Sequence, residues 1–134
     1  MNIEKIVVFW AESAKDDWPV AEHLFTSHDY HYSLFFGHLY LEKLMKALVV
    51  QVSKEHAPRS HNLLYLAERA SLTISDSKRE ILARVNKYNL ETRYPEDREA
   101  LHDFYTPDFA KTELKVIWEM GEWLNSQLSH KKAS

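Results

Sequence analysis

The segment YHYSLFFGHLYLEKLMKALVVQV, from Tyr30 to Val52, is the longest stretch of the chain that can form one uninterrupted helix. It contains no proline and a single glycine, Gly37. At about 100° per residue one face carries apolar side chains, namely those of Tyr30, Leu34, Leu41, Leu44, Met45, Leu48 and Val52. A second flank gathers Tyr32, Phe35, Leu39 and Val50. A helix that is apolar on more than one side is typical of the middle of a bundle, so we expect the other helices to pack around this one.

A narrower polar stripe, formed by His31, His38, Glu42 and Lys46, runs along the same segment. Its residues His38, Glu42 and Lys46 follow one another at four-residue steps and therefore share one side of the helix. A histidine and a glutamate at this spacing can transfer protons or bind a metal ion. The second such helix that a di-metal bundle needs is missing, and the spacing also suits an intrahelical charge ladder. We therefore predict no metal ion and no cofactor.

Length and composition favour a single helical domain. The 134 residues fall within the usual range for one domain, and we predict one domain over residues 1–134 with a tail over about 130–134. Two glycines and four prolines are few for a turn-rich β protein. The chain has no cysteine, which excludes disulfides and thiolate chemistry. A net charge of −3 argues against nonspecific electrostatic binding of nucleic acid.

The chain shows no targeting or membrane segment. Its N-terminus lacks the basic region and the long apolar core of a signal peptide. No apolar run approaches the ~20 residues that a membrane-spanning helix requires. We therefore expect a cytoplasmic protein with no membrane partner.

The flanking sequence predicts further helices on both sides of the central one. Helical spacing of apolar residues predicts a first helix over Ile3 to Thr26, with a kink or break at Asp16 to Pro19 because proline removes a helical hydrogen bond. After the central helix, Ser60 is a plausible N-cap for a short helix over His61 to Ala70.

Two longer helices complete the prediction. Ser77 and Glu80 match a capping box and begin a helix that runs to about Arg93. The run Thr106-Pro107-Asp108 begins the last helix, because it combines a capping hydroxyl, a first-turn proline and an N-terminal carboxylate. The fold class is therefore all-α: an antiparallel up-and-down four-helix bundle with an additional short helix, five helices in all.

The helix that ends near Arg93 carries the most informative polar face. Asn86, Asn89 and Arg93 lie within about 60° of one another around the helix axis. Two amides and a guanidinium on one face can recognise a nucleobase edge and a phosphate together. The same residues could instead form the polar border of a helix–helix or subunit contact.

A second arrangement could support RNA cleavage. Arg98 and His102 are one helical turn apart, and Arg93 precedes His102 by nine positions. In such a pair the imidazole exchanges a proton with the 2′-OH or the leaving oxygen, and the arginine stabilises charge on the phosphorane. Nearby carboxylates would repel a phosphate backbone and favour local salt bridges instead, namely Asp97, Glu99 and Asp103.

Motifs along nearly the whole chain resemble the HEPN domain family. The first helix has the Trp-x3-Ala-x2-Asp start, and the segment FFGHLYLEKLMKALVV is similar to the family's aromatic-rich helix, with His38 where relatives often have glutamine. The triplet from His61 to Leu63 resembles the His-Asp-Leu opening of helix three. The end of the next helix resembles the Asn…Tyr…Arg-Tyr-Pro signature of small stand-alone members, here as Asn86, Tyr88, Arg93, Tyr94 and Pro95.

The resemblance implies a helical bundle that is usually a homodimer, and several roles. Some relatives bind nucleotides or partner proteins, and others are metal-independent ribonucleases or toxins, often paired with a minimal nucleotidyltransferase. The ribonuclease subset has four to six residues between its arginine and histidine, whereas this chain has eight after Arg93 and three after Arg98.

Our leading hypothesis is therefore a nucleotide-binding or partner-binding module, plausibly the companion of a minimal nucleotidyltransferase in a toxin–antitoxin-like pair. The ligand, a nucleotide or RNA, would bind at a site composed of Asn86, Asn89, Arg93, Tyr94, His38 and Glu42. The alternative hypothesis is a metal-independent endoribonuclease toxin with a non-standard pair formed by Arg93 or Arg98 with His102.

Overall fold

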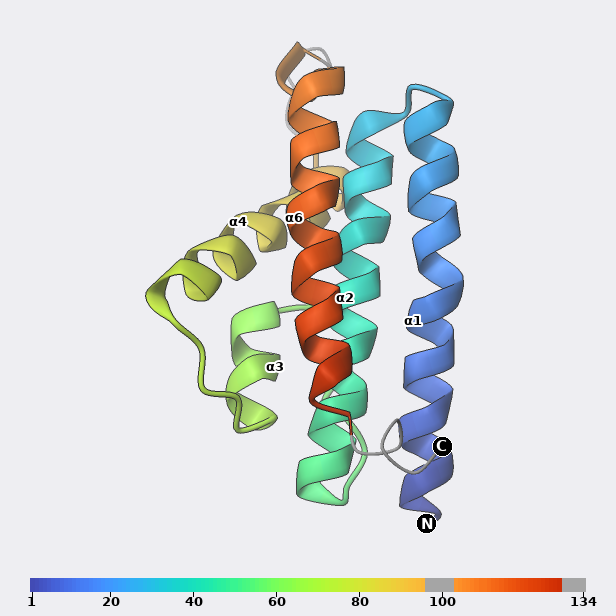
Figure 1. Cartoon of the computed structure of the whole chain (residues 1–134), viewed down its shortest axis with the longest axis vertical. Helices are drawn as coiled ribbons and strands as arrows, with labels where there is room; N and C mark the ends of the chain where they lie inside the picture. The colour runs from blue at the N-terminus through green and yellow to red at the C-terminus, as the bar shows by residue number, and fades with distance from the viewer. Residues whose placement is uncertain (96–102, 129–134) are drawn as a thin grey trace.

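The computed structural model describes residues 1–95 and 103–128, and within these ranges the chain forms five helices and no strands (Figure 1). The helices are α1 (Ile3–Thr26), α2 (Tyr30–Ser53), α3 (Leu63–Arg69), α4 (Asp76–Arg93) and α6 (Pro107–Ser126). The predicted all-α bundle of five helices is thus confirmed.

Helix α2 is the centre of the bundle, as its two apolar flanks predict. Each of α1, α3, α4 and α6 packs against it, whereas α1 and α6 approach each other less closely and meet at the rings of Trp18 and Trp118, 5.0 Å apart. Figure 1 shows α1, α2 and α6 standing side by side, with α3 and α4 on the side of α2 away from α1. Helix α1 is antiparallel to α2, and α6 runs in the same direction as α2 because α3 and α4 supply the return path.

The core is built mainly from α2. Among its side chains Leu34, Leu41 and Met45 are completely buried. They meet apolar residues of the surrounding helices, and the largest of these are Leu63, Leu66, Leu82, Ile117 and Leu124. Burial of side chains of this size contributes roughly 1.5–3 kcal/mol each, so packing on α2 is the main force that holds the bundle together.

The predicted break in the first helix is wrong. Helix α1 continues from Ile3 to Thr26 with Pro19 inside it. Its inner face is buried against α2 on both sides of the proline, at Val7, Ala14 and Ala21. Because this packing extends over the whole helix, it offsets the hydrogen bond that the proline removes.

Two predicted helix starts are also wrong by about two residues. Asn62, not Ser60, caps α3, because its Oδ1 accepts hydrogen bonds from the backbone N–H groups of the first turn. The Ser60 hydroxyl instead accepts from the Asn62 N–H, 3.1 Å away, in the turn before the helix. Helix α4 is capped by Ser75 rather than Ser77. The start of α6 is confirmed, with Thr106 as its cap.

No helix in residues 1–95 and 103–128 is long and apolar enough to cross a membrane.

Candidate functional site

A pocket of about 380 Å³ opens between the start of α3 and the last two turns of α4. Four of the residues that the sequence places in a ligand site line it, namely Asn86, Asn89, Arg93 and Tyr94. His61, Asn62 and Leu90 complete the wall. The other two predicted residues, His38 and Glu42, come from α2 and contact this wall through hydrogen bonds to Asn89 and His61. The fold therefore brings all six predicted residues together.

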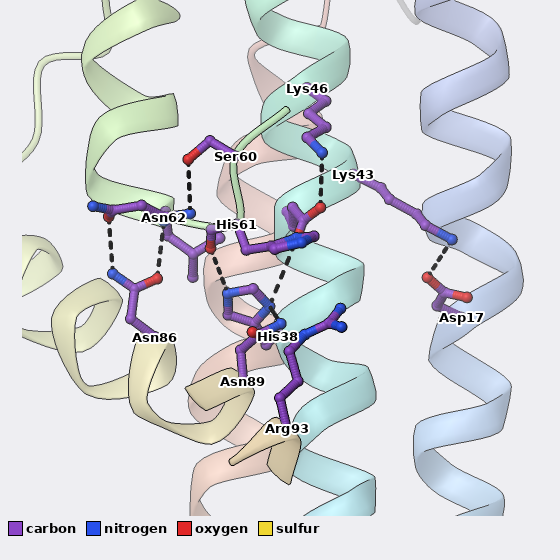
Figure 2. A network of polar contacts seen from close by, with 12 residues as sticks. Asp17, His38, Lys43, Lys46, Ser60, His61, Asn62, Asn86, Asn89 and Arg93 are labelled. Atoms are coloured by element: carbon purple, nitrogen blue, oxygen red, sulfur yellow. Dashed lines mark hydrogen bonds and ion pairs between the residues drawn. The ribbon is translucent and has the colours of Figure 1, made fainter. Parts of the chain in front are cut away.

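The side chain of Asn86 joins α4 to the start of α3. Its Oδ1 accepts the N–H of Leu63 at 2.9 Å, and its Nδ2 donates to Oδ1 of Asn62 at 3.0 Å (Figure 2). The N–H of Leu63 is one of the first-turn donors that a helix cannot satisfy internally. Asn86 thus acts as a second cap for α3 and fixes one edge of the pocket.

Asn89 is buried and links α4 to α2. Its Nδ2 donates to Nδ1 of His38 at 3.3 Å, and its Oδ1 accepts from Nε of Arg93 at 3.1 Å. Donor and acceptor of this amide are therefore both engaged within the protein. The two asparagines therefore shape the pocket, and Arg93 supplies the arginine side chain among its lining residues.

The His38 ring lies at the bottom of this arrangement and is completely buried. Its Nε2 lies 2.8 Å from the carbonyl oxygen of His61, which can only accept, so Nε2 carries the proton. Nδ1 then has the lone pair that accepts from Asn89. Burial lowers the pKa of His38 to about 4, although the nearby Glu42 carboxylate acts in the opposite direction. His38 is therefore neutral at pH 7.

Glu42 forms the second link between α2 and the pocket. One carboxylate oxygen lies 2.9 Å from Nδ1 of His61, and the other accepts from Nζ of Lys46 at 2.9 Å. The Lys46 ammonium also lies 5.2 Å from the ring centroid of Trp10. Of the charge ladder predicted from sequence, the Glu42–Lys46 ion pair is thus present and His38 is neutral. The ion pair is buried under the α2–α3 connection, and its carboxylate orients His61.

Arg93 is held in place by neutral groups. Besides the hydrogen bond to Asn89, its guanidinium carbon lies 5.4 Å from the ring centroid of Phe35, a cation–π distance. Within residues 1–95 and 103–128, Arg93 forms no ion pair with a carboxylate. Its charge is therefore not neutralised by this part of the chain, and its two terminal nitrogens form no hydrogen bond with a described residue.

A separate polar cluster positions the middle of α4 against α6. The guanidinium of Arg84 donates two hydrogen bonds to the carboxylate of Glu113, at 2.6 and 3.1 Å, and the hydroxyl of Tyr88 donates to the same carboxylate. Burial, together with this carboxylate, raises the pKa of Tyr88, so the hydroxyl keeps its proton. This cluster joins α4 to α6, together with the Lys78 ammonium over the Trp123 ring and the edge-to-face contact between Tyr88 and Phe109.

Sequence reasoning missed three residues that line the pocket, and it named two others that lie outside the described residues. The missed residues are His61, Asn62 and Leu90. His61 and Asn62 were identified only as part of the opening of helix three, because the ring contact of His61 with Glu42 depends on how the α2–α3 connection folds. The two others are Arg98 and His102, the remaining candidates for RNA cleavage. In the part of the chain that the structure describes, no three His, Asp or Glu side chains form a group that could hold a metal ion.

Comparison with known proteins agrees with this architecture. Residues 7–127 match the family model for the HEPN domain. The crystal structure of TT1696 from Thermus thermophilus superposes with a TM-score of 0.73 at 20 % identity, over 91 % of this chain and 98 % of that chain, which indicates a shared fold. No curated protein matches the sequence. Because the family model covers nearly the whole chain, the protein belongs to the HEPN domain family.

Proposed function

We propose that this HEPN-type module binds a nucleotide, or a similar phosphate-bearing ligand, in the pocket between α3 and α4. The observation that carries the proposal is the state of Arg93: it is oriented by Asn89 and Phe35, and no carboxylate of the described residues neutralises it. The two terminal nitrogens of this guanidinium form no hydrogen bond with a described residue, and a guanidinium fork matches the oxygens of a phosphate group.

The surroundings of Arg93 suit the rest of a nucleotide. Tyr94 is 72 % exposed and Leu90 is 59 % exposed, and both line the pocket. Exposed aromatic and apolar side chains of this kind provide surfaces on which a nucleobase can stack. A volume of about 380 Å³ also falls within the range of small-molecule sites.

Calorimetric titration of the purified protein with adenosine 5′-monophosphate tests this proposal. We expect binding with a dissociation constant below a millimolar and a loss of at least tenfold in affinity for Arg93→Gln. Arg79→Gln is the matched control, because Arg79 is an exposed arginine at the other end of α4 and does not line the pocket. Absence of binding at millimolar nucleotide, or equal affinity of the two variants, would contradict the proposal.

Partner binding is a second part of the proposal, and it rests on family membership. HEPN domains often occur as dimers and as companions of minimal nucleotidyltransferases in toxin–antitoxin-like pairs. We expect a homodimer in light scattering at micromolar concentration, and co-purification of a nucleotidyltransferase from the native host. A monomer at high micromolar concentration would contradict the first expectation, and a chain that purifies alone would contradict the second.

The alternative, a metal-independent endoribonuclease, uses Arg93 or Arg98 with His102. Its support in the structure is the guanidinium of Arg93, which pairs with no carboxylate of the described residues. It predicts RNA cleavage in the presence of a chelator that His102→Ala abolishes, and intact RNA after prolonged incubation with the wild type would exclude it.

A further inference from the structure

One ring nitrogen of His61 is engaged by Glu42, and the other is engaged by no described residue. Its Nδ1 is 2.9 Å from the buried carboxylate of Glu42, which fixes the rotation of the ring. The other ring nitrogen, Nε2, has no hydrogen bond to a described residue. The side chain is 53 % exposed and lines the same pocket as Arg93. Two nitrogen-bearing groups from different elements, the α2–α3 connection and α4, thus line one cavity.

The charged and titratable groups near His61 come from α2 and α4. Glu42 faces it from α2 and is itself bound by Lys46, while His38, also on α2, is neutral. Arg93 lies across the pocket on α4. An imidazolium at His61 would donate Nδ1–H to Glu42 and Nε2–H to a bound anion, so both of its protons would have an acceptor.

We propose that His61 is the second anion-contacting group of this site, and that together with Arg93 it selects a terminal phosphate monoester over a phosphodiester. This inference rests on the proposed nucleotide site and specifies its ligand class. A monoester carries nearly two negative charges at pH 7 and has three terminal oxygens, whereas a diester carries one charge and has two. Arg93 alone can donate to both terminal oxygens of a diester and balance its single charge. The additional charge and the third terminal oxygen of a monoester are what His61 recognises.

Selection of a monoester by His61 should change the number of protons that the complex binds. At pH 7.5 a monoester is mostly a dianion, because the second pKa of a phosphate monoester is about 6. When the dianion binds beside Nε2, it favours the imidazolium, and the complex takes up a proton from the buffer. Because His61 is the group that takes up this proton in the proposal, replacement of His61 should abolish the proton uptake on binding.

The experiment compares three ligands on the full chain by calorimetry at pH 7.5: adenosine 5′-monophosphate, its 5′-O-methyl phosphodiester, and adenosine. Each titration is run in two buffers with different ionisation enthalpies, so that proton uptake is measured directly. We expect the monoester to bind about tenfold more tightly than the diester, with uptake of a measurable fraction of a proton. Adenosine should bind more weakly than either.

His61→Gln is the test variant, and His56→Gln is its control, because His56 is an exposed histidine of the same connection that does not line the pocket. His61→Gln should reduce monoester affinity to that of the diester, leave diester affinity within about twofold, and abolish proton uptake. His56→Gln should behave as the wild type. Thermal unfolding of each variant verifies that the fold is retained.

The outcomes separate this inference from the proposed function. If monoester and diester bind the wild type equally, or if proton uptake is zero, the inference is wrong while nucleotide binding through Arg93 stands. The wild-type comparison alone decides this, even if His61→Gln does not fold. If His61→Gln weakens both phosphate ligands equally, the selective role of His61 is also wrong. If none of the three ligands binds at millimolar concentration, the proposed function and the inference both fail.

Discussion

The two sides of α2 are held by different kinds of interaction. Toward α3 and α4, the helix presents His38 and Glu42, and the contacts are hydrogen bonds and ion pairs. Toward α1 and α6 it presents Tyr40, whose ring lies 5.1 Å from that of Trp18 and 6.1 Å from that of Trp118. One ion pair, from Lys43 to Asp17 at 2.8 Å, accompanies this packed side (Figure 2).

Pockets lie on both sides, about 420 Å³ beside Tyr40 and Trp118 and about 380 Å³ beside Arg93, so the two sides differ in the interactions around the pocket rather than in room. Aromatic packing tolerates little change in shape, and it needs no polar group to be satisfied. A buried hydrogen-bond network fixes the orientation of each side chain in it. Arg93 lies at the edge of this network. On the polar side, single substitutions should therefore alter ligand binding and the pH dependence of stability. On the packed side, single substitutions should alter stability alone.

The largest effect that we expect on the polar side depends on pH. Folded His38 has a pKa of about 4 because it is buried, whereas an unfolded histidine has a pKa near 6.5. As the pH falls, the unfolded chain binds the proton first, so stability that is fully present above pH 6.5 is lost as the pH falls toward 4. The loss amounts to about 3 kcal/mol.

His38→Gln isolates this contribution. A glutamine amide can donate to the His61 carbonyl and accept from Asn89, yet it does not titrate. Urea unfolding at several pH values should show that the stability difference between wild type and variant changes by about 3 kcal/mol between pH 7 and pH 4. If the two curves stay parallel over this range, His38 is not the buried neutral group described above.

A matched pair of glycines probes the packed side. A Cβ at Gly121 would lie 2.3 Å from Cε2 of Tyr40, inside the aromatic cluster, whereas a Cβ at Gly37 would lie 2.9 Å from Cδ1 of Ile117, the end of a flexible side chain. Alanine also gains about 1 kcal/mol of helix propensity over glycine. We expect Gly121→Ala to lower stability by about 2 kcal/mol and Gly37→Ala to change it by less than about 1 kcal/mol.

Chemical denaturation of both variants measures this difference, and their nucleotide affinity should equal that of the wild type. A Gly121→Ala protein as stable as Gly37→Ala would mean that Tyr40 can move, and that the packed side is less rigid than the contrast requires.

The smallest expected effect compares one asparagine from each side. Asn86→Ala removes the acceptor of the Leu63 N–H and should cost about 1.5 kcal/mol, with a parallel loss of nucleotide affinity because the pocket edge is released. Asn125→Ala removes a longer contact, 3.5 Å to the Tyr40 hydroxyl, and should cost about 0.5 kcal/mol with unchanged affinity. Equal effects on affinity would remove the functional distinction between the two sides.

The sequence was sufficient for the fold because apolar periodicity carries most of the information. The central position of α2 follows from its two apolar flanks, and the cap at Thr106 follows from residue types alone. The continuity of α1 through Pro19 does not, because it depends on packing against a helix elsewhere in the chain. The caps at Asn62 and Ser75 were missed because several capping residues lie close together and tertiary contacts choose among them.

The site was predictable as a list of residues but not as an arrangement. Helical spacing places Asn86, Asn89 and Arg93 on one face, and it places His38 and Glu42 together on another helix. No local signal shows that Asn89 meets His38 across 51 positions, or that the ring of His61 turns onto Glu42. Such contacts follow from the packing of α3 and α4 on α2, which periodicity does not specify.

The hydrogen bonds that run from Arg93 through Asn89 and His38 to the His61 carbonyl all point the same way. Asn89 and His38 each accept a hydrogen bond from the side of Arg93 and donate one toward the His61 carbonyl. All three hydrogen bonds therefore have the same donor-to-acceptor direction. A replacement at position 38 must therefore accept at one end and donate at the other over the same length. Glutamine meets this condition, whereas leucine, lysine and glutamate do not. Sequence variation at this position should accordingly be narrow, because the completely buried side chain has no other partners to which it could turn.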